Sequence, residues 1–261
     1  MKVRRALRDQ LGLLVGALAL WQLASLAFGA HWFSPPLATT RRFVELTWSG
    51  ELLRHAQYTL LAAGGGFLLG GVPGALIPFG LRRAPRLAAV LDPYLVAGYG
   101  MPKLALAPLF ILWFGIGLAS KVALVASIVF FLIFFATAAG VRGVNPRLVA
   151  MARVAGASER SVARHVVWPG AVPYIFTGLK VSLPYAIGAA VVGELISSNR
   201  GLGYLIQAAS QDFDTTTVFV GLLALTLLIV AVNGLVEAAE RRLLRWRPAD
   251  VQPARRLATA T

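Results

Sequence analysis

The sequence predicts an all-α, polytopic membrane protein with about six transmembrane helices. Of its 261 residues, 57% are hydrophobic and only 14% are charged, which is too little charge to cover a soluble protein of this length. Hydrocarbon cannot satisfy backbone N–H and C=O groups, so a spanning segment must be a helix or part of a closed barrel. Long uninterrupted apolar runs do not fit the alternating pattern of a barrel strand, and helices remain.

Six apolar windows supply the spans. Four of them carry no charged side chain, and each is long enough to cross a hydrocarbon core of roughly 30 Å. These are Leu11–Ala30, Ala56–Leu81, Val122–Val141 and Thr215–Val236. Two further windows are interrupted by a single lysine each, and they are Pro93–Ser120 with Lys103 and Val166–Gly193 with Lys180.

The first window could be mistaken for a secretory signal peptide, because basic residues precede it. The apolar run is long for the hydrophobic region of such a peptide, and Ala24–Ala30 offers only a weak small-residue cleavage pattern. We therefore expect this window to be retained as a membrane anchor.

The basic residues indicate how the chain is oriented. There are 25 Lys and Arg residues against 11 Asp and Glu, which gives a net charge of +14. With both termini in the cytoplasm, 18 of the 25 fall on the cytoplasmic side. The outer side holds Arg41, Arg42, Arg54, Lys121 and Arg200. This asymmetry follows the positive-inside rule, so we interpret the charge as facing anionic membrane lipid and expect no nucleic-acid partner.

The residues for metal, redox or enzymatic chemistry are missing or scattered. The chain has no cysteine, which excludes disulfides and thiolate ligands. His31, His55 and His165 fall in different loops, so we expect no metal site. A membrane-embedded enzyme would need clustered carboxylates or a nucleophile with a base, and the sequence shows neither.

Two spans carry backbone features beyond simple hydrophobicity. In the second span Gly66, Gly70 and Gly74 recur every four residues, which leaves one face open to close helix packing or to a sliding gate. In the third span, Pro93, Pro102 and Pro108 remove backbone donors and are expected to bend or break the helix. Such a break either is a packing kink or lines a water-filled pathway.

The loop at residues 145–169 is long, basic and helix-prone. Pro146 suits a helix start, and Gly156 would end that helix as a C-terminal cap. Ser158 can cap a second short helix, which Pro169 is expected to stop. Two short helices at a sharp angle would form a projection that a partner can push, although a solvated connector lying on the headgroups is the alternative.

This loop resembles that of the binding-protein-dependent permeases of type I ABC importers, whose pattern is Glu-Ala-Ala-x3-Gly-x9-Ile-x-Leu-Pro. Ala152, Gly156 and Pro169 match the pattern, with Val166 at the isoleucine position. Ala150, Met151 and Trp168 depart from it, and Ala150 removes the usual carboxylate. The resemblance extends over residues 55–247, through Pro108–Gly117, Pro173–Lys180, Gly193–Tyr204 and Glu240–Arg245. These stretches are similar to the branch that imports sulfonates, taurine, nitrate and some thiamine-precursor or aromatic compounds.

The resemblance implies a bacterial inner-membrane permease subunit that works with partners. It implies a homodimer of this chain, two copies of a cytoplasmic ATPase and a periplasmic substrate-binding protein. ATP and Mg would be held by the ATPase, and this chain has no Gly-x4-Gly-Lys-Ser/Thr motif of its own, so we expect a non-enzyme without a bound cofactor. The residues that would meet the ATPase are Ala150, Ala152, Arg153, Gly156, Ala157, Ser158, Arg164 and Pro169.

The resemblance also suggests a division of the chain. Residues 1–54 would be the first transmembrane helix and an outer-face connector. Separately, the mixture of charged and apolar residues in 31–56 predicts a short amphipathic helix on the outer face. Residues 55–247 would be the permease domain, with residues 145–169, called the coupling segment below, as its contact with the ATPase. Residues 248–261 would be a disordered cytoplasmic tail.

Charged and irregular positions within the spans are candidates for the translocation pathway or its gate. The candidates are Pro102, Lys103, Pro108, Glu194, Ser197 and Asn199. Lys103 could meet an anionic solute or extend to the interface, and for Lys180 the interface is favoured. Glu194 and the polar residues after it could close the outer mouth, dock the binding protein or form an ordinary helix-end turn. A secondary transporter would need ionisable groups near the midplane, whereas Glu194 is expected at the periphery.

Overall fold

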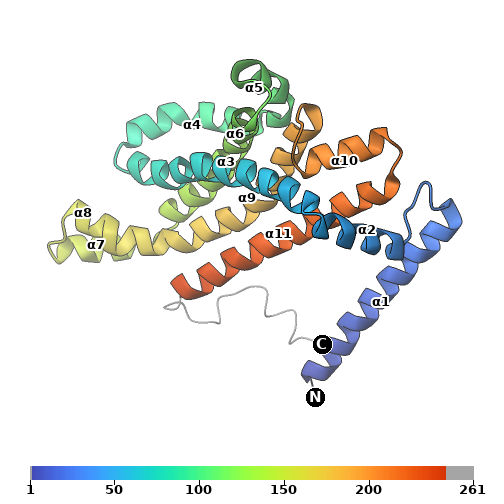
Figure 1. Ribbon diagram of the computed structural model, residues 1–261. Helices are drawn as coiled ribbons and strands as arrows, with labels where there is room; N and C mark the ends of the chain where they lie inside the picture. Colours follow the sequence, from blue (N-terminus) through green and yellow to red (C-terminus); the bar gives the residue numbers. More distant parts are fainter. Residues whose placement is uncertain (1, 245–261) are drawn as a thin grey trace.

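The computed structural model describes the backbone of residues 2–244 and the side chains from residue 8 onward (Figure 1). Within this part of the chain every regular element is a helix. Within the described residues, five helices are long and apolar enough to cross a membrane, and a bent helix pair brings the number to the predicted six when it is counted as one span. The helices are α1 Lys2–Phe28, α2 Pro36–Trp48, α3 Glu51–Leu81, α4 Pro85–Gly100, α5 Ala107–Phe114, α6 Leu118–Arg142, α7 Pro146–Val154, α8 Glu159–Val162, α9 Trp168–Ile196, α10 Leu202–Gln211 and α11 Thr215–Leu243. The predicted tail, residues 248–261, lies outside the described residues.

The third span is broken, as predicted, and the break lies at Pro102. Helix α4 ends at Gly100, a 3-10 turn covers Lys103–Leu106, and α5 follows at an angle of 82° to α4. Pro93 lies inside α4 without ending it, and Pro108 lies in the first turn of α5, where no backbone donor is needed. Of the three prolines, only Pro102 therefore marks the interruption.

The core is built on α3, α6 and α9. The glycine face of α3 lies directly against α6, and a Cβ atom on Gly70 would lie 2.3 Å from the carbonyl oxygen of Ala126. A Cβ on Gly74 would lie 2.7 Å from the carbonyl oxygen of Phe130. Val125 and Ile133 of α6 are fully buried in this contact. The repeat therefore serves close packing within one chain.

A second cluster joins α2, α10 and α11 at the opposite end from α7 and α8 (Figure 1). The connector contains the predicted amphipathic helix, α2, whose Leu46 is buried in one cluster with Leu202 of α10 and Val220 of α11. Asp214 caps α11 by accepting a 3.0 Å hydrogen bond from the backbone N–H of Thr217. Burial raises the pKa of the Asp214 carboxyl, but hydrogen bonds from Thr217 and Thr216 together with the nearby Arg42 outweigh it, so the pKa is lowered overall.

Helix α1 extends away from this body and meets it near its outer end (Figure 1). The Trp21 indole donates a 2.9 Å hydrogen bond to the carbonyl oxygen of Ser34, and its ring stacks on Phe219 with centroids 5.7 Å apart. Most other described side chains of α1 are exposed. This helix is a lipid- or partner-facing arm.

The α3–α6 contact predicts that a single methyl group at Gly70 will lower stability. Gly70→Ala places Cβ inside contact distance of backbone atoms, which cannot rotate away, and overpacking of this kind costs about 1–3 kcal/mol. Gly64→Ala in the same helix is the control, because its Cβ meets nothing within 4 Å. Thermal melting in detergent should show a lower Tm for Gly70→Ala only. Equal melting temperatures would show that α6 can shift away at little cost.

Candidate functional site

The coupling segment begins with a well-capped helix. The Asn145 side chain accepts a 2.9 Å hydrogen bond from the backbone N–H of Arg147, and α7 starts at Pro146. Gly156 ends the helix with φ of +82°, a left-handed conformation that suits glycine. Ser158 then accepts a 3.2 Å bond from the N–H of Ser161 and caps α8. The predicted start, turn and second cap are confirmed.

The prediction that Pro169 stops the second helix is wrong. From Glu159 the chain stays helical through Ile196, and a π-helical turn at Ala163–Val167 joins α8 to α9. In this wider turn the Trp168 N–H bonds to the carbonyl oxygen of Ala163, five residues back. Pro169 then lies in the first turn of α9, where its missing N–H is tolerated. The π turn thus allows the helix to continue.

One face of the coupling segment is anchored to the membrane helices. Val162 and Val167 are buried with Val141 of α6, and Ala152 and Ala157 pack against this cluster. The Arg153 guanidinium lies 2.6 Å from the Glu159 carboxylate and ties α7 to α8. Both side chains are more than half exposed, so this ion pair contributes little stability.

The other face of α7 is an unpartnered apolar ridge that the sequence analysis did not single out. Leu148, Met151 and Val154 recur at three-residue spacing and are 53%, 68% and 90% exposed. Among the predicted contact residues, Ala150, Arg153, Gly156, Ser158 and Arg164 are exposed, while Ala152, Ala157 and Pro169 are half-buried. The available signal was the three-residue spacing of these apolar side chains, which was not among the features used to predict the helix.

Lys103 caps the C-terminal end of α4 at the break in the third span. Its Nζ donates to the carbonyl oxygens of Tyr99, at 2.9 Å, and Met101, at 3.4 Å, and lies 4.5 Å from the centroid of the Phe131 ring. A helix end leaves such carbonyls without partners, and a nearby cation stabilises them. Lys180 also has a partner inside the protein, since its Nζ lies 2.7 Å from the Glu240 carboxylate.

Glu194 lies in the last turn of α9, near the end of its span, and its side chain is directed into the protein. Its side chain is fully buried and accepts hydrogen bonds from the Thr59 hydroxyl, at 3.0 Å, and the Gly203 N–H, at 2.9 Å. The Thr59 hydroxyl in turn accepts a 2.8 Å bond from the N–H of Leu202. The carboxylate therefore joins α3, α9 and α10, and we call these residues the Glu194 network.

The charge distribution places Lys121 on the outer side, but its side chain is not exposed there. It lies in the first turns of α6 with a buried side chain, and its Nζ donates to the carbonyl oxygen of Ser197. Lys121 also interacts electrostatically with Glu194. The network thus includes Ser197, whereas Asn199 is exposed. Pro102 and Pro108 lie elsewhere, at the two ends of the break in the third span. The six predicted pathway residues do not form one cluster.

The Glu194 network predicts that replacing Thr59 lowers thermal stability, whereas replacing an exposed threonine does not. Thr59→Val removes one hydrogen-bond partner each from the Leu202 N–H and the Glu194 carboxylate. We expect the free energy of unfolding to fall by about 1–3 kcal/mol. Thr226→Val is the control, because that hydroxyl is exposed and bonds only to the Leu222 carbonyl oxygen of its own helix. Thermal melting in detergent should show a lower Tm for Thr59→Val alone. An unchanged Tm would mean that water replaces the lost hydroxyl.

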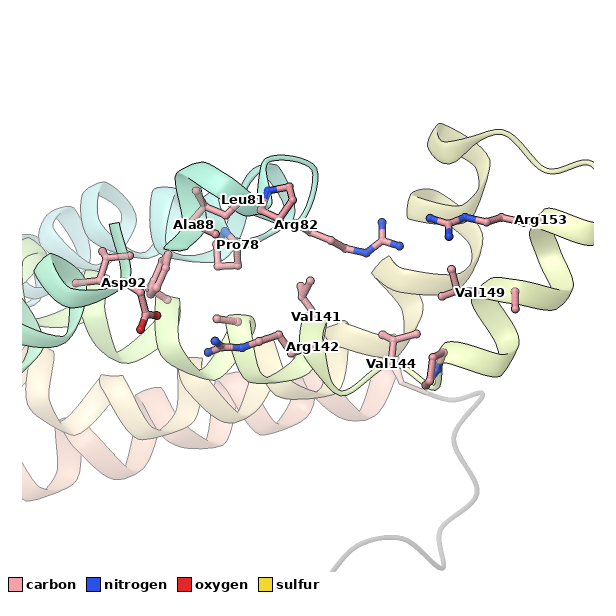
Figure 2. A pocket seen from close by; sticks show the side chains of 16 residues that line it. Pro78, Leu81, Arg82, Ala88, Asp92, Val141, Arg142, Val144, Val149 and Arg153 are labelled. Carbon is pink, nitrogen blue, oxygen red and sulfur yellow. The ribbon is translucent and has the colours of Figure 1, made fainter. Parts of the chain in front are cut away.

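A cavity of about 560 Å³ lies between the coupling segment and the ends of α3, α4 and α6 (Figure 2). Ala150 and Arg153 line it, and none of the six predicted pathway residues does. Within residues 2–244, no group of three or more His, Asp or Glu side chains is arranged to hold a metal ion.

Comparison with solved structures supports the fold. The chain superimposes on a chain of the inward-facing MetNI methionine ABC transporter with a TM-score of 0.60 and 18% identity, over 74% of this chain and 94% of that chain. An amino acid ABC transporter crystallised with histidines gives a TM-score of 0.57 at 19% identity, over 76% of this chain and 97% of that chain. The arrangement of helices is therefore that of ABC transporter permeases.

Sequence comparison gives closer relatives. The chain is 37% identical to SsuC of Bacillus subtilis, named for aliphatic sulfonates transport, over 90% of this chain and 87% of that protein. It is 37% identical to the riboflavin transport permease RibX of Chloroflexus aurantiacus, covering 88% and 86% of the two chains. It is 30% identical to the taurine transport permease TauC of Escherichia coli, covering 94% of each. Residues 66–245 match the family described as binding-protein-dependent transport system inner membrane component. The chain belongs to this family of ABC importer permeases and is a multi-pass inner-membrane protein.

Proposed function

We propose that this permease forms the pathway for a small organic anion of the sulfonate or taurine type, delivered by a periplasmic binding protein and driven by a separate ATPase. The names of SsuC and TauC support the substrate class. Nitrate, an inorganic anion, is also among the solutes that the sequence resemblance predicts. The equal identity to RibX keeps an aromatic or thiamine-precursor compound as the second candidate.

The observation that carries the proposal is the two-faced coupling segment. Its inner face is held by the buried Val162 and Val167, and its outer face presents Leu148, Met151 and Val154 with no partner in the chain. An exposed apolar ridge on a soluble-facing helix indicates a protein interface. We assign this ridge to the ATPase, one copy for each of two permease chains.

The orientation fits this assignment. Figure 1 shows α3 and α11 ending on the same side of the molecule as α7 and α8. Arg82 follows the end of α3, and Arg241 and Arg242 lie in the last turn of α11. We therefore place the coupling segment and both termini in the cytoplasm, with α2 and α10 on the periplasmic side, and take residues 55–247 as the permease domain.

Reconstitution tests the proposal directly. Proteoliposomes containing this chain, its ATPase and its binding protein should take up labelled taurine or an alkanesulfonate only when ATP and the binding protein are both present. Uptake by the chain alone, driven by an ion gradient, would contradict the assignment. Uptake of riboflavin but not of the sulfonates would support the second candidate.

Gly156 tests the coupling segment in the same assay. Gly156→Pro is incompatible with φ of +82°, because proline holds φ near −65°, and we expect ATP hydrolysis to become independent of the binding protein and uptake to fall at least about tenfold. Gly156→Asn is the matched control, since asparagine tolerates the left-handed region. Similar uptake by both variants would mean that the turn does not transmit the ATPase movement.

Lys103 remains a proposed pathway residue, and two substitutions separate its possible roles. Lys103→Gln keeps a donor for the Tyr99 and Met101 carbonyl oxygens but removes the charge, and Lys103→Met removes both. If the charge attracts an anionic solute, both variants should reduce its uptake by a similar factor. If Lys103 only closes the end of α4, Lys103→Gln should retain uptake and Lys103→Met should not.

A further inference from the structure

The cavity beside the coupling segment combines an apolar trough with a basic mouth. Its walls are mostly apolar side chains from four elements (Figure 2). They include Pro78 and Leu81 of α3, Ala88 and Leu95 of α4, and Phe134 and Val141 of α6. A hydrocarbon chain can lie against such a wall without leaving a polar group unsatisfied.

The charged groups at this cavity favour an anion. Arg82, Arg142 and Arg153 line it, against a single carboxylate, Asp92. Arg153 pairs with Glu159, but within the described residues neither Arg82 nor Arg142 makes an ion pair. Figure 2 shows the Arg82 and Arg153 side chains extending toward one another across the mouth. Because Glu159 already offsets the charge of Arg153, Arg82 and Arg142 supply the uncompensated positive charge at the cavity, and an anion near the mouth would be attracted by it.

The cavity also lies at the level where a membrane helix leaves the hydrocarbon. Arg82 follows the last residue of α3, Arg142 is the last residue of α6, and Pro85 is the first residue of α4. The basic mouth is thus at a membrane boundary, and the apolar wall runs from it along the spans. Anionic lipid headgroups lie at this depth.

We propose that this cavity binds an anionic phospholipid of the cytoplasmic leaflet, with its phosphate between Arg82 and Arg153 and an acyl chain along the apolar wall. Guanidinium groups form short, charge-assisted hydrogen bonds with phosphate oxygens. Residues at helix ends form the basic mouth, and the sides of the helices form the apolar trough. The mouth therefore suits the charged headgroup of a phospholipid, and the trough suits an acyl chain.

The transported anion is a poorer match for the same cavity. The break at Pro102, the Lys103 side chain and the Glu194 network contribute nothing to its lining. The apolar wall is also larger than a taurine-type solute requires. A lipid here would contact Ala150 and Arg153 of the coupling segment, so that, if the proposed function holds, the lipid composition would affect ATPase coupling.

Lipid binding can be measured without any transport readout. The permease, purified with its ATPase in a mild detergent, is titrated with phosphatidylglycerol or with phosphatidylcholine of the same acyl chains and followed by native mass spectrometry. We expect one phosphatidylglycerol per permease chain, bound at least about tenfold more tightly than phosphatidylcholine. Equal binding of the two lipids would overturn the proposal.

Three variants locate the site. Arg82→Gln should weaken phosphatidylglycerol binding about tenfold, whereas Arg86→Gln, an equal change of charge at an exposed position of α4 outside the cavity, should change it less than about twofold. Ala88→Phe fills the trough without changing any charge and should displace the lipid. Equal effects of Arg82→Gln and Arg86→Gln would reduce the interaction to general surface charge and overturn the site.

A competition experiment separates the lipid from a free anion. An alkanesulfonate or inorganic phosphate at millimolar concentration should leave the bound phosphatidylglycerol in place. Displacement by the sulfonate would assign the cavity to the transported solute and overturn the lipid proposal. These assays measure lipid binding and not transport. Their outcome is therefore independent of whether the reconstituted transporter takes up sulfonates.

Discussion

The close approach of α3 to α6 is the contact on which the rest of the structure depends. In a bilayer the hydrophobic effect does not drive helices together, so association rests on packing and on polar contacts. Gly66, Gly70 and Gly74 bring the two backbones together because they present no side chain between them. With α6 held there, α9 packs against its other side, and the positions of the coupling segment and the Glu194 network follow from these helices.

The Glu194 network adds a polar contact at the outer end of the same helices. A buried carboxylate and a buried ammonium are costly to place away from water, and each is retained only with partners. Here Thr59, Gly203 and the Ser197 carbonyl oxygen supply them. Because these partners come from α3, α9 and α10, a displacement of one helix disturbs the hydrogen bonds of the others.

The features that could be predicted from the sequence are local ones. The six spans follow from hydropathy, and the caps at Asn145, Gly156 and Ser158 follow from preferences that act within one turn. The burial and the partners of Lys121 and Glu194 depend on which helix faces which, a property that one sequence does not display. Pro169 was misread because a π turn removed the need for its N–H, and such turns have no reliable sequence signal.

The uninterrupted helix from Glu159 to Ile196 has a mechanical consequence. Its α9 portion alone has 29 residues and is about 43 Å long at 1.5 Å per residue. The coupling segment is attached to one end of this rod, and the Glu194 carboxylate lies near the other. Pro173 and Pro184 lie inside α9 without dividing it into separate helices, so, in the proposed orientation, a tilt imposed at its cytoplasmic end would be carried toward Glu194 at its periplasmic end.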